Sequence, residues 1–290
     1  MKEPAEAKEV KEAQQKCGEV AAFFDLDGTL LALPSLERRL FRTLRYQRAI
    51  PAKNYFLWLR EAVRLMPRGI SAIAQANKMY LRSVQTFEEC GGGGGDVSSR
   101  HKASHQAEGQ ASAAPRRNPQ LPVPSFFPQA IERVAWHARQ RHEIVVVSGT
   151  LEPLASTAAR AMETELTARG ITVAIRVCAT RVEEMHGAWT GRVLGETMFG
   201  EAKARAAKRL AAEMRLDLAR CYAYGDTAND RWLLGVVGKA TAVNPSKELA
   251  RIARTHGWAV LHWEGKEGLT QRHRGRRETA KRKERPTVIA

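Results

Sequence analysis

The sequence predicts an α/β fold with a largely parallel sheet and helices on both faces. Short apolar runs rich in β-branched residues alternate with longer helical patterns along most of the chain. This alternation is typical of consecutive β–α units, whose helices cover both faces of a parallel sheet. In addition, three of the runs end directly in loops rich in Asp, Ser and Gly. Ligand-binding residues of open α/β sheets lie at such strand ends.

Each expected strand is a short apolar run, and each expected helix follows or precedes one at a distance typical of β–α units. The first strand ends at an aspartate, and a helix over residues 152–169 is closed by Gly170. The expected strands are residues 20–24, 143–147, 171–177, 188–193, 219–224, 239–243 and 258–262. The expected helices are residues 128–140, 152–169, 203–214, 228–236 and 247–256.

The α/β pattern is interrupted and flanked by segments of different composition. We expect a catalytic core from residues 19–33 and 124–265 and a small helical cap from residues 34–90, which Pro51 and Pro67 divide. Five consecutive glycines and several prolines predict a flexible insertion. The insertion covers residues 91–123, a charged helical extension covers residues 1–18, and a basic disordered tail covers residues 266–290.

Composition excludes several classes of protein. The chain has 290 residues, of which 43% are hydrophobic, so disorder of the whole chain is excluded. No apolar run reaches the roughly 18 to 20 residues of a membrane-spanning helix. The first residues alternate in charge and lack the apolar region of a secretory signal. Four scattered cysteines form no metal-binding spacing, which favours reduced thiols and a cytoplasmic location.

The formal net charge of +16 predicts an anionic partner. The excess lies in two segments: residues 34–90 hold 11 Lys and Arg against four acidic residues, and residues 266–290 hold nine against three. We expect most of the cap arginines to form a solvated face, with a few attracting an anionic substrate. The aromatic residues Phe56, Trp58 and Tyr80 are expected in the interior of the cap.

The polar strand ends predict a phosphoryl-transfer site. Residues 25–29, 148–150 and 225–230 would converge at one edge of the sheet, near Lys203. Clustered carboxylates at Asp25 and Asp226 would repel each other unless a hard cation such as Mg²⁺ lay between them.

Within this site, one carboxylate could attack phosphorus and another, two residues away, could transfer protons. The Ser148 hydroxyl, nearby backbone N–H groups and Lys203 could hold the phosphoryl oxygens.

Four stretches identify a family. FFDLDGTLL, VVVSGT, GEAK and GDTAND, in this order, resemble the four motifs of the haloacid dehalogenase superfamily. The helical segment between the first two motifs resembles the C1-type cap of the phosphoserine-phosphatase-like subfamily IB. The resemblance covers about residues 19–264 and implies a Rossmann-like core and an Mg²⁺-dependent phosphatase acting on a small phosphorylated substrate.

The resemblance also implies a role for each motif residue. Asp25 would be the nucleophile and a metal ligand, and Asp27 the general acid/base and a ligand through its carbonyl. Asp226 would bind the metal, and Asp230 would bind it or orient its water. The residues that resemble phosphate-binding positions are Ser148, Gly149, Lys203 and Asn229.

One position departs from the family pattern. Phosphoserine phosphatases of this family usually carry a Glu about nine residues after the nucleophile, where it reads the substrate amine. Here that position is Pro34, and the nearest acid is Glu37. This difference argues against strict phosphoserine specificity.

Two alternatives stay open from sequence. The basic cap and tail could bind an anionic surface, either nucleic acid, for which no specific motif is present, or acidic lipid as a peripheral contact. The site could also serve a lipid phosphate or transfer its phosphoryl group to an acceptor other than water. The sequence gives no indication of oligomeric state.

Overall fold

The computed structural model describes residues 20–69, 73, 76–86 and 124–264. The expected N-terminal helix, flexible insertion and basic tail, which are residues 1–18, 91–123 and 266–290, lie outside the described residues. Among the described helices, none combines the length and apolar character needed to cross a membrane.

The described strands form one seven-stranded sheet in the order β4-β3-β2-β1-β5-β6-β7. Neighbouring strands run parallel, except that β3 and β4 form an antiparallel hairpin at one edge. The prediction of a mainly parallel sheet is therefore confirmed. The strands are β1 (Ala21–Phe24), β2 (Glu143–Leu151), β3 (Ile175–Met185), β4 (Ala188–Leu194), β5 (Tyr222–Gly225), β6 (Lys239–Val243) and β7 (Ala259–Leu261).

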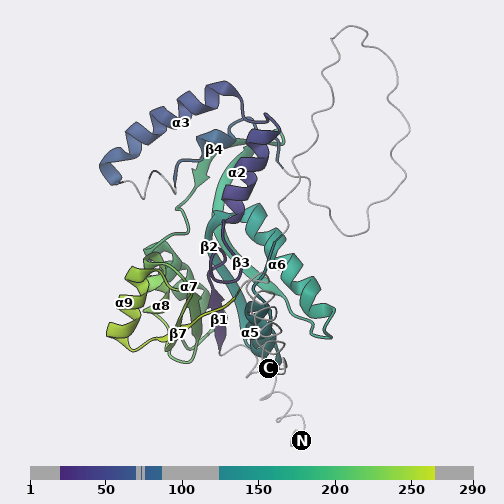
Figure 1. The fold of residues 1–290 in the computed structure, drawn as a ribbon, viewed down its shortest axis with the longest axis vertical. Helices are drawn as coiled ribbons and strands as arrows, with labels where there is room; N and C mark the ends of the chain where they lie inside the picture. The colour runs from purple at the N-terminus through teal and green to yellow at the C-terminus, as the bar shows by residue number, and fades with distance from the viewer. Residues whose placement is uncertain (1–19, 70–72, 74–75, 87–123, 265–290) are drawn as a thin grey trace, which may run out of the picture.

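Helices cover both faces of this sheet (Figure 1). Successive residues of the central strand β1 point to opposite faces, so Phe24 packs into one hydrophobic cluster and Phe23 into the other. Both side chains are fully buried. Phe24 shares its cluster with α5 (Pro128–Arg139) and α6 (Glu152–Thr167), whereas Phe23 shares its cluster with α7 (Glu201–Met214), α8 (Arg231–Leu234) and α9 (Lys247–His256).

Two further helices follow the first strand, α2 (Leu36–Tyr46) and α3 (Ala52–Leu65). The buried leucines of α2 belong to the same cluster as Phe24, so this helix packs onto the core. By contrast, α3 packs against the short 3₁₀ segments η1 (Met66–Arg68) and η2 (Met79–Leu81), and it lies at the outer end of the molecule (Figure 1). The division of the chain into core and cap thus stays a proposal for α2.

Two expected strands begin later than the pattern predicts. The strand expected at residues 171–177 starts at Ile175, because the backbone N–H of Ile171 still bonds the Leu166 carbonyl at the end of α6. Similarly, β5 starts at Tyr222, because the N–H of Cys221 is held by the turn at Asp217. Hydrophobicity marks these segments correctly, but hydrogen bonds of the preceding turns set their first strand residue.

Two other local predictions are wrong. Residues 148–150, expected as a loop, lie inside β2, because pairing with β3 resumes at Leu151 after an irregular register. The helix expected at residues 228–236 divides into a 3₁₀ turn, η4 (Ala228–Asp230), and the short α8. The Asp230 carboxylate bonds back to the N–H of Thr227, which fixes the tight first turn.

Of the three aromatic residues expected in the interior of the cap, only one is buried. Tyr80 is buried, but Phe56 is 69% exposed and Trp58 is 39% exposed. Both lie on α3, whose buried face is formed by other residues, including Asn54 and Leu65. An aromatic residue on an amphipathic helix is buried only if it falls on the packed face.

A buried histidine contributes to the core beneath the sheet. His137 on α5 places Nε2 2.9 Å from the Tyr224 hydroxyl oxygen and Nδ1 2.8 Å from Nδ1 of His142. Burial, followed by the neighbouring His142, lowers the pKa of His137 to about 3. The folded protein therefore keeps this ring neutral over a range in which the unfolded chain, with a histidine pKa of about 6.5, becomes protonated.

This difference predicts a pH-dependent loss of stability. As pH falls from 8 to 5, the unfolded chain takes up a proton at His137 that the folded protein does not. This should remove about 2 kcal/mol from the free energy of unfolding. The variant His137→Gln cannot take up this proton. Its free energy of unfolding should therefore fall by about 2 kcal/mol less than that of wild type between pH 8 and pH 5. Urea denaturation at both pH values, with the exposed His262→Gln as control, measures the difference; parallel pH dependences for His137→Gln and wild type would contradict it.

Candidate active site

The aspartate cluster lies where the strand order of the sheet reverses. Asp25 directly follows β1, and Asp226 directly follows the neighbouring β5. The chain proceeds from β1 to β2 on one side and returns to β5 on the other, which leaves a crevice between the two carboxyl ends. The N–H of Asp25 bonds the Tyr224 carbonyl at 2.9 Å, so strand pairing itself holds the two loops together.

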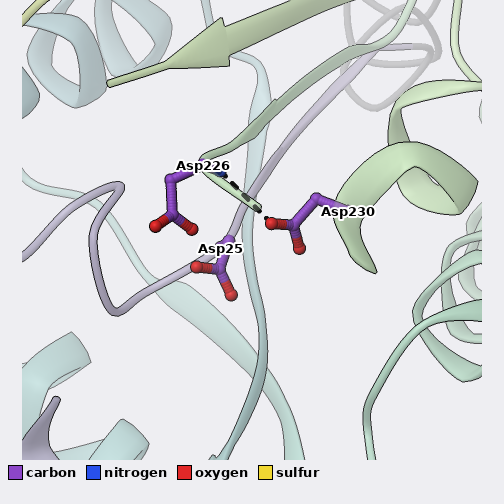
Figure 2. Close-up of side chains that lie close together, drawn as sticks. All are labelled: Asp25, Asp226 and Asp230. Carbon is purple, nitrogen blue, oxygen red and sulfur yellow. Dashed lines mark hydrogen bonds between the residues drawn. The ribbon is translucent and has the colours of Figure 1, made fainter. Parts of the chain in front are cut away.

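Three buried carboxylates face one another at this point. Oxygen atoms of Asp25, Asp226 and Asp230 lie within 4.8 Å of one another (Figure 2). Asp230 reaches the cluster from η4, and its Oδ2 accepts hydrogen bonds from the N–H groups of Asp226 and Thr227 at 3.2 and 2.9 Å. These bonds close the loop after β5 into a compact turn and point the Oδ1 atom of Asp230 toward the cluster.

Lys203 is the basic partner of the cluster. Its Nζ lies 2.5 Å from Oδ1 of Asp25 and 2.6 Å from Oδ1 of Asp230, and the side chain is buried. Lys203 lies in the first turn of α7, which Gly200 begins with a positive φ of 57°. Burial acts to lower the pKa of Lys203, but the two carboxylates outweigh it and hold that pKa above its usual range. The side chain is therefore a fixed cation.

The charges of the cluster do not balance. Burial raises the pKa of Asp226 to about 9, with the neighbouring Asp25 charge as the next cause. Burial also raises the pKa of Asp25 to about 7, although Lys203 opposes this rise. Three carboxylates facing one ammonium thus create a demand for further positive charge. The donor set consists of hard oxygen atoms, which fits a divalent cation such as Mg²⁺.

The main chain leaves room for this oxygen cluster at Gly28. Gly28 has a positive φ of 92°, and a Cβ atom there would lie 2.1 Å from Oδ2 of Asp226. A side chain at this position would occupy the space of the carboxylate. The D-x-D-G sequence therefore requires glycine for two reasons, backbone conformation and close approach.

Asp27 lies beside the cluster with both oxygens engaged. Its Oδ1 accepts a hydrogen bond from the Leu36 N–H at 2.9 Å, and its Oδ2 accepts one from the Thr150 hydroxyl at 2.5 Å. Burial raises the pKa of Asp27, and the Thr150 bond opposes this rise. The carboxyl group is thus oriented by two donors, and its pKa is shifted toward the protonated form.

Ser148 and Gly149 line the same region from within β2. The Ser148 hydroxyl oxygen accepts a hydrogen bond from the Thr150 N–H at 3.2 Å, and the Gly149 carbonyl accepts one from Thr180 at 2.8 Å. A Cβ atom at Gly149 would lie 2.9 Å from the Phe199 ring. The irregular register of β2 here lets its backbone line the site rather than continue the sheet pairing.

These residues surround one cavity of about 310 Å³. The structure brings all eight residues predicted from sequence to this region: seven line the cavity, and Asp230 contacts Lys203 beside it. The seven lining residues are Asp25, Asp27, Ser148, Gly149, Lys203, Asp226 and Asn229.

The cavity also contains a pair that sequence reasoning did not assign. Buried Lys78 places Nζ 2.5 Å from Oε1 of Glu37, and the Tyr80 hydroxyl donates to the same oxygen at 2.8 Å. Glu37 and Lys78 both line the cavity. They lie 41 residues apart, and no motif links them, so only the packing of η2 against α2 reveals the pair. The one sequence feature that could have pointed to this pair is the position of Glu37, the acidic residue nearest to Pro34.

The two roles of Gly28 predict a specific effect of substitution. Gly28→Ala should cost about 1 to 3 kcal/mol of unfolding free energy more than Gly170→Ala, because overpacking adds to backbone strain. Gly170 is the matched control, since it also has a positive φ, 74°, but no atom lies within 4 Å of its Cβ position. Chemical denaturation of both variants measures the difference. Equal losses of stability would show that Asp226 does not occupy the space above Gly28.

Comparisons with known proteins agree with the fold. The model of the haloacid dehalogenase-like hydrolase family matches residues 22–234. Phosphoserine phosphatase SerB1 of Mycobacterium tuberculosis is 29% identical over 245 residues, which cover 83% of this chain and 70% of that protein.

Solved structures show the same architecture. A protein of unknown function from Bordetella pertussis superposes with a TM-score of 0.55 at 25% identity, over 84% of this chain and 98% of that one. A phosphoserine phosphatase carrying a phospho-aspartyl intermediate analogue superposes with a TM-score of 0.50 at 14% identity, over 88% of this chain and 98% of that one, a similarity of fold. The chain thus belongs to the haloacid dehalogenase-like hydrolase family, as its four motifs predict.

Proposed function

We propose that this hydrolase is a phosphatase, which hydrolyses a small phosphomonoester through an aspartyl-phosphate on Asp25, with Asp27 as the general acid and base. The main support is one arrangement. Asp25, which the buried Lys203 holds, and Asp27, which two hydrogen-bond donors hold, line the same cavity. Nucleophilic and acid–base catalysis require these two groups on one substrate.

In the first half-reaction, Asp25 attacks phosphorus. Lys203 holds Oδ1 of Asp25, so the second oxygen of that carboxylate is the one presented for attack. The new bond joins this oxygen to phosphorus, and the bond from phosphorus to the alcohol oxygen breaks. Asp27, whose pKa is raised by burial, gives its proton to the departing alkoxide.

In the second half-reaction, water releases the phosphate. The Asp27 carboxylate takes a proton from a water molecule, and the water oxygen attacks phosphorus. The bond between phosphorus and Asp25 breaks, which returns both carboxyl groups to their starting states and yields inorganic phosphate. The Leu36 N–H and Thr150 hydroxyl keep Asp27 in one orientation during both steps.

The remaining predicted residues bind the phosphoryl group. Ser148, Gly149 and Asn229 line the cavity with polar atoms, and the Lys203 ammonium adds a positive charge. Hydrogen-bond donors and a fixed cation stabilise the charge that develops on the transferring group. Lys203 therefore acts twice in this proposal, on the nucleophile and on the phosphate.

We propose Mg²⁺ as the cofactor, held by Asp25, Asp226, Asp230 and the Asp27 backbone carbonyl. The support is the unbalanced charge of three buried carboxylates around one ammonium. When bound, the ion would supply positive charge to the phosphoryl oxygens and remove the repulsion between the carboxylates.

Glu37 and Lys78 are the groups placed to meet the alcohol part of the substrate. Glu37 already accepts hydrogen bonds from Lys78 and Tyr80, so its charge is compensated without a substrate ammonium. Burial and the Glu37 charge hold the Tyr80 pKa well above its usual range, so the hydroxyl stays a donor. A small phosphomonoester with a polar alcohol portion fits this wall, and strict dependence on the phosphoserine amine is not expected.

The nucleophile assignment predicts loss of turnover in Asp25→Asn. Phosphate release should fall at least about 10³-fold, while the circular dichroism spectrum stays that of wild type. The matched control Asp217→Asn, an exposed aspartate, should keep wild-type activity. Borohydride reduction during turnover, followed by peptide mass spectrometry, should convert residue 25 to homoserine in wild type alone. Turnover by Asp25→Asn at the wild-type rate would reject the assignment.

The cofactor proposal predicts that a chelator abolishes phosphate release and that Mg²⁺ restores it. Ca²⁺ should restore much less, because its larger and looser coordination fits an in-line reaction poorly. The measurement is phosphate release after dialysis against EDTA and readdition of each ion. Full activity in the dialysed protein, with metal content below one ion per ten chains by mass spectrometry, would contradict the proposal.

The cavity wall predicts a change of substrate affinity in Lys78→Gln. Loss of one charged donor should raise KM about tenfold with a smaller change in kcat, across a panel of small phosphomonoesters that includes phosphoserine. Arg82→Gln, an exposed position on the same segment, is the control and should keep the wild-type KM. An unchanged KM in a folded Lys78→Gln protein would remove Lys78 from substrate binding.

A further inference from the structure

The outward face of α3 carries a continuous apolar stripe. Phe56, Leu59 and Val63 on α3 and Met66 at its C-cap, spaced by three and four residues, are 69%, 57%, 59% and 62% exposed. Tyr55, 47% exposed, adjoins this stripe. Single exposed apolar residues are normal on protein surfaces, but several on one helix face indicate an interaction surface.

The opposite face of α3 packs against the rest of the protein. Asn54 and Leu65 are buried there, and the Asn54 amide donates to the carbonyls of Tyr80 and Arg82 at 3.1 and 2.6 Å. The Asn77 amide donates to the Trp58 carbonyl at 2.7 Å. These bonds fasten α3 to the segment that carries Lys78, so the helix cannot roll its apolar stripe inward without breaking them.

Positive charge flanks the stripe on one side. Lys53, Arg60 and Arg64 are exposed and fall together on the helical wheel, next to Phe56 and Val63. The acidic residue of α3, Glu61, lies toward the covered side and pairs with Arg64 at 2.6 Å. The exposed surface of α3 therefore combines apolar side chains with cations and presents no exposed carboxylate of its own.

We propose that α3 docks on the surface of an anionic lipid bilayer, with the stripe in the interface and the three cations at the headgroups. Helices that lie in the membrane plane have this composition, bulky apolar residues on one face and Lys or Arg beside them. Nucleic acid would use the cations but leave Leu59, Val63 and Met66 in water, so the apolar stripe favours the bilayer.

The surface is separate from the catalytic groups but linked to the cavity. The three hydrogen bonds that fasten α3 hold the backbone around Lys78, which lines the cavity wall. Docking would thus hold the phosphatase at a bilayer with its cavity wall attached to the docking helix. The proposal does not depend on which phosphomonoester is hydrolysed.

Vesicle sedimentation of the full chain tests this proposal. Wild type should sediment with vesicles of phosphatidylglycerol and phosphatidylcholine, bind pure phosphatidylcholine much less, and lose affinity as salt rises. Leu59→Ser combined with Val63→Ser should weaken binding about tenfold or more. Both variant and wild type should hydrolyse a soluble phosphomonoester equally, which shows that the variant folds.

A matched control distinguishes binding through this face from non-specific binding through other exposed apolar side chains. Leu194→Ser combined with Val260→Ser removes two other exposed apolar side chains, on β4 and β7, and should leave vesicle binding unchanged. Equal binding by the α3 variant and wild type would overturn the proposal, because the attraction would then come from other basic residues. A wild-type dimer that the α3 variant converts to monomer, seen by sedimentation equilibrium without lipid, would also overturn it in favour of a second copy on this face.

Discussion

The site depends on the electrostatic imbalance of three buried carboxylates around one buried ammonium. Asp25, Asp226 and Asp230 come from two neighbouring strand ends, and Lys203 bridges two of them. Burial makes the charged forms costly, and it raises the pKa values of Asp25 and Asp226. Such a cluster is stable in its ionised form only with additional positive charge nearby, so the fold itself creates the demand for a cation.

The surrounding structure serves to hold this cluster in place. Parallel pairing of β1 with β2 and β5 brings the first, second and fourth motifs to one edge of the sheet. Gly28 leaves the space that the Asp226 carboxylate fills, and Asp230 closes its own loop through bonds to the backbone. Each of these features is local. Together they allow the three carboxylates to lie close to one another without separation of the loops after β1 and β5.

The sequence predicted that Asp25 and Asp226 would lie together because each directly follows a strand, and neighbouring parallel strands bring their ends together. It could not predict the Glu37–Lys78 pair, since that contact depends on how α2 and η2 pack. It placed Phe56 and Trp58 in the interior because apolar composition does not specify which helix face is covered. Strand starts at Ile175 and Tyr222 were missed because hydrogen bonds from adjacent turns compete with strand pairing.

A crystal structure of the protein grown with Mg²⁺ tests the central claim most directly. We expect one ion in contact with carboxylate oxygen atoms of Asp25 and Asp226, with Lys203 still bound to Asp25. A well-ordered site at saturating Mg²⁺ in which no ion contacts these carboxylates would contradict the claim.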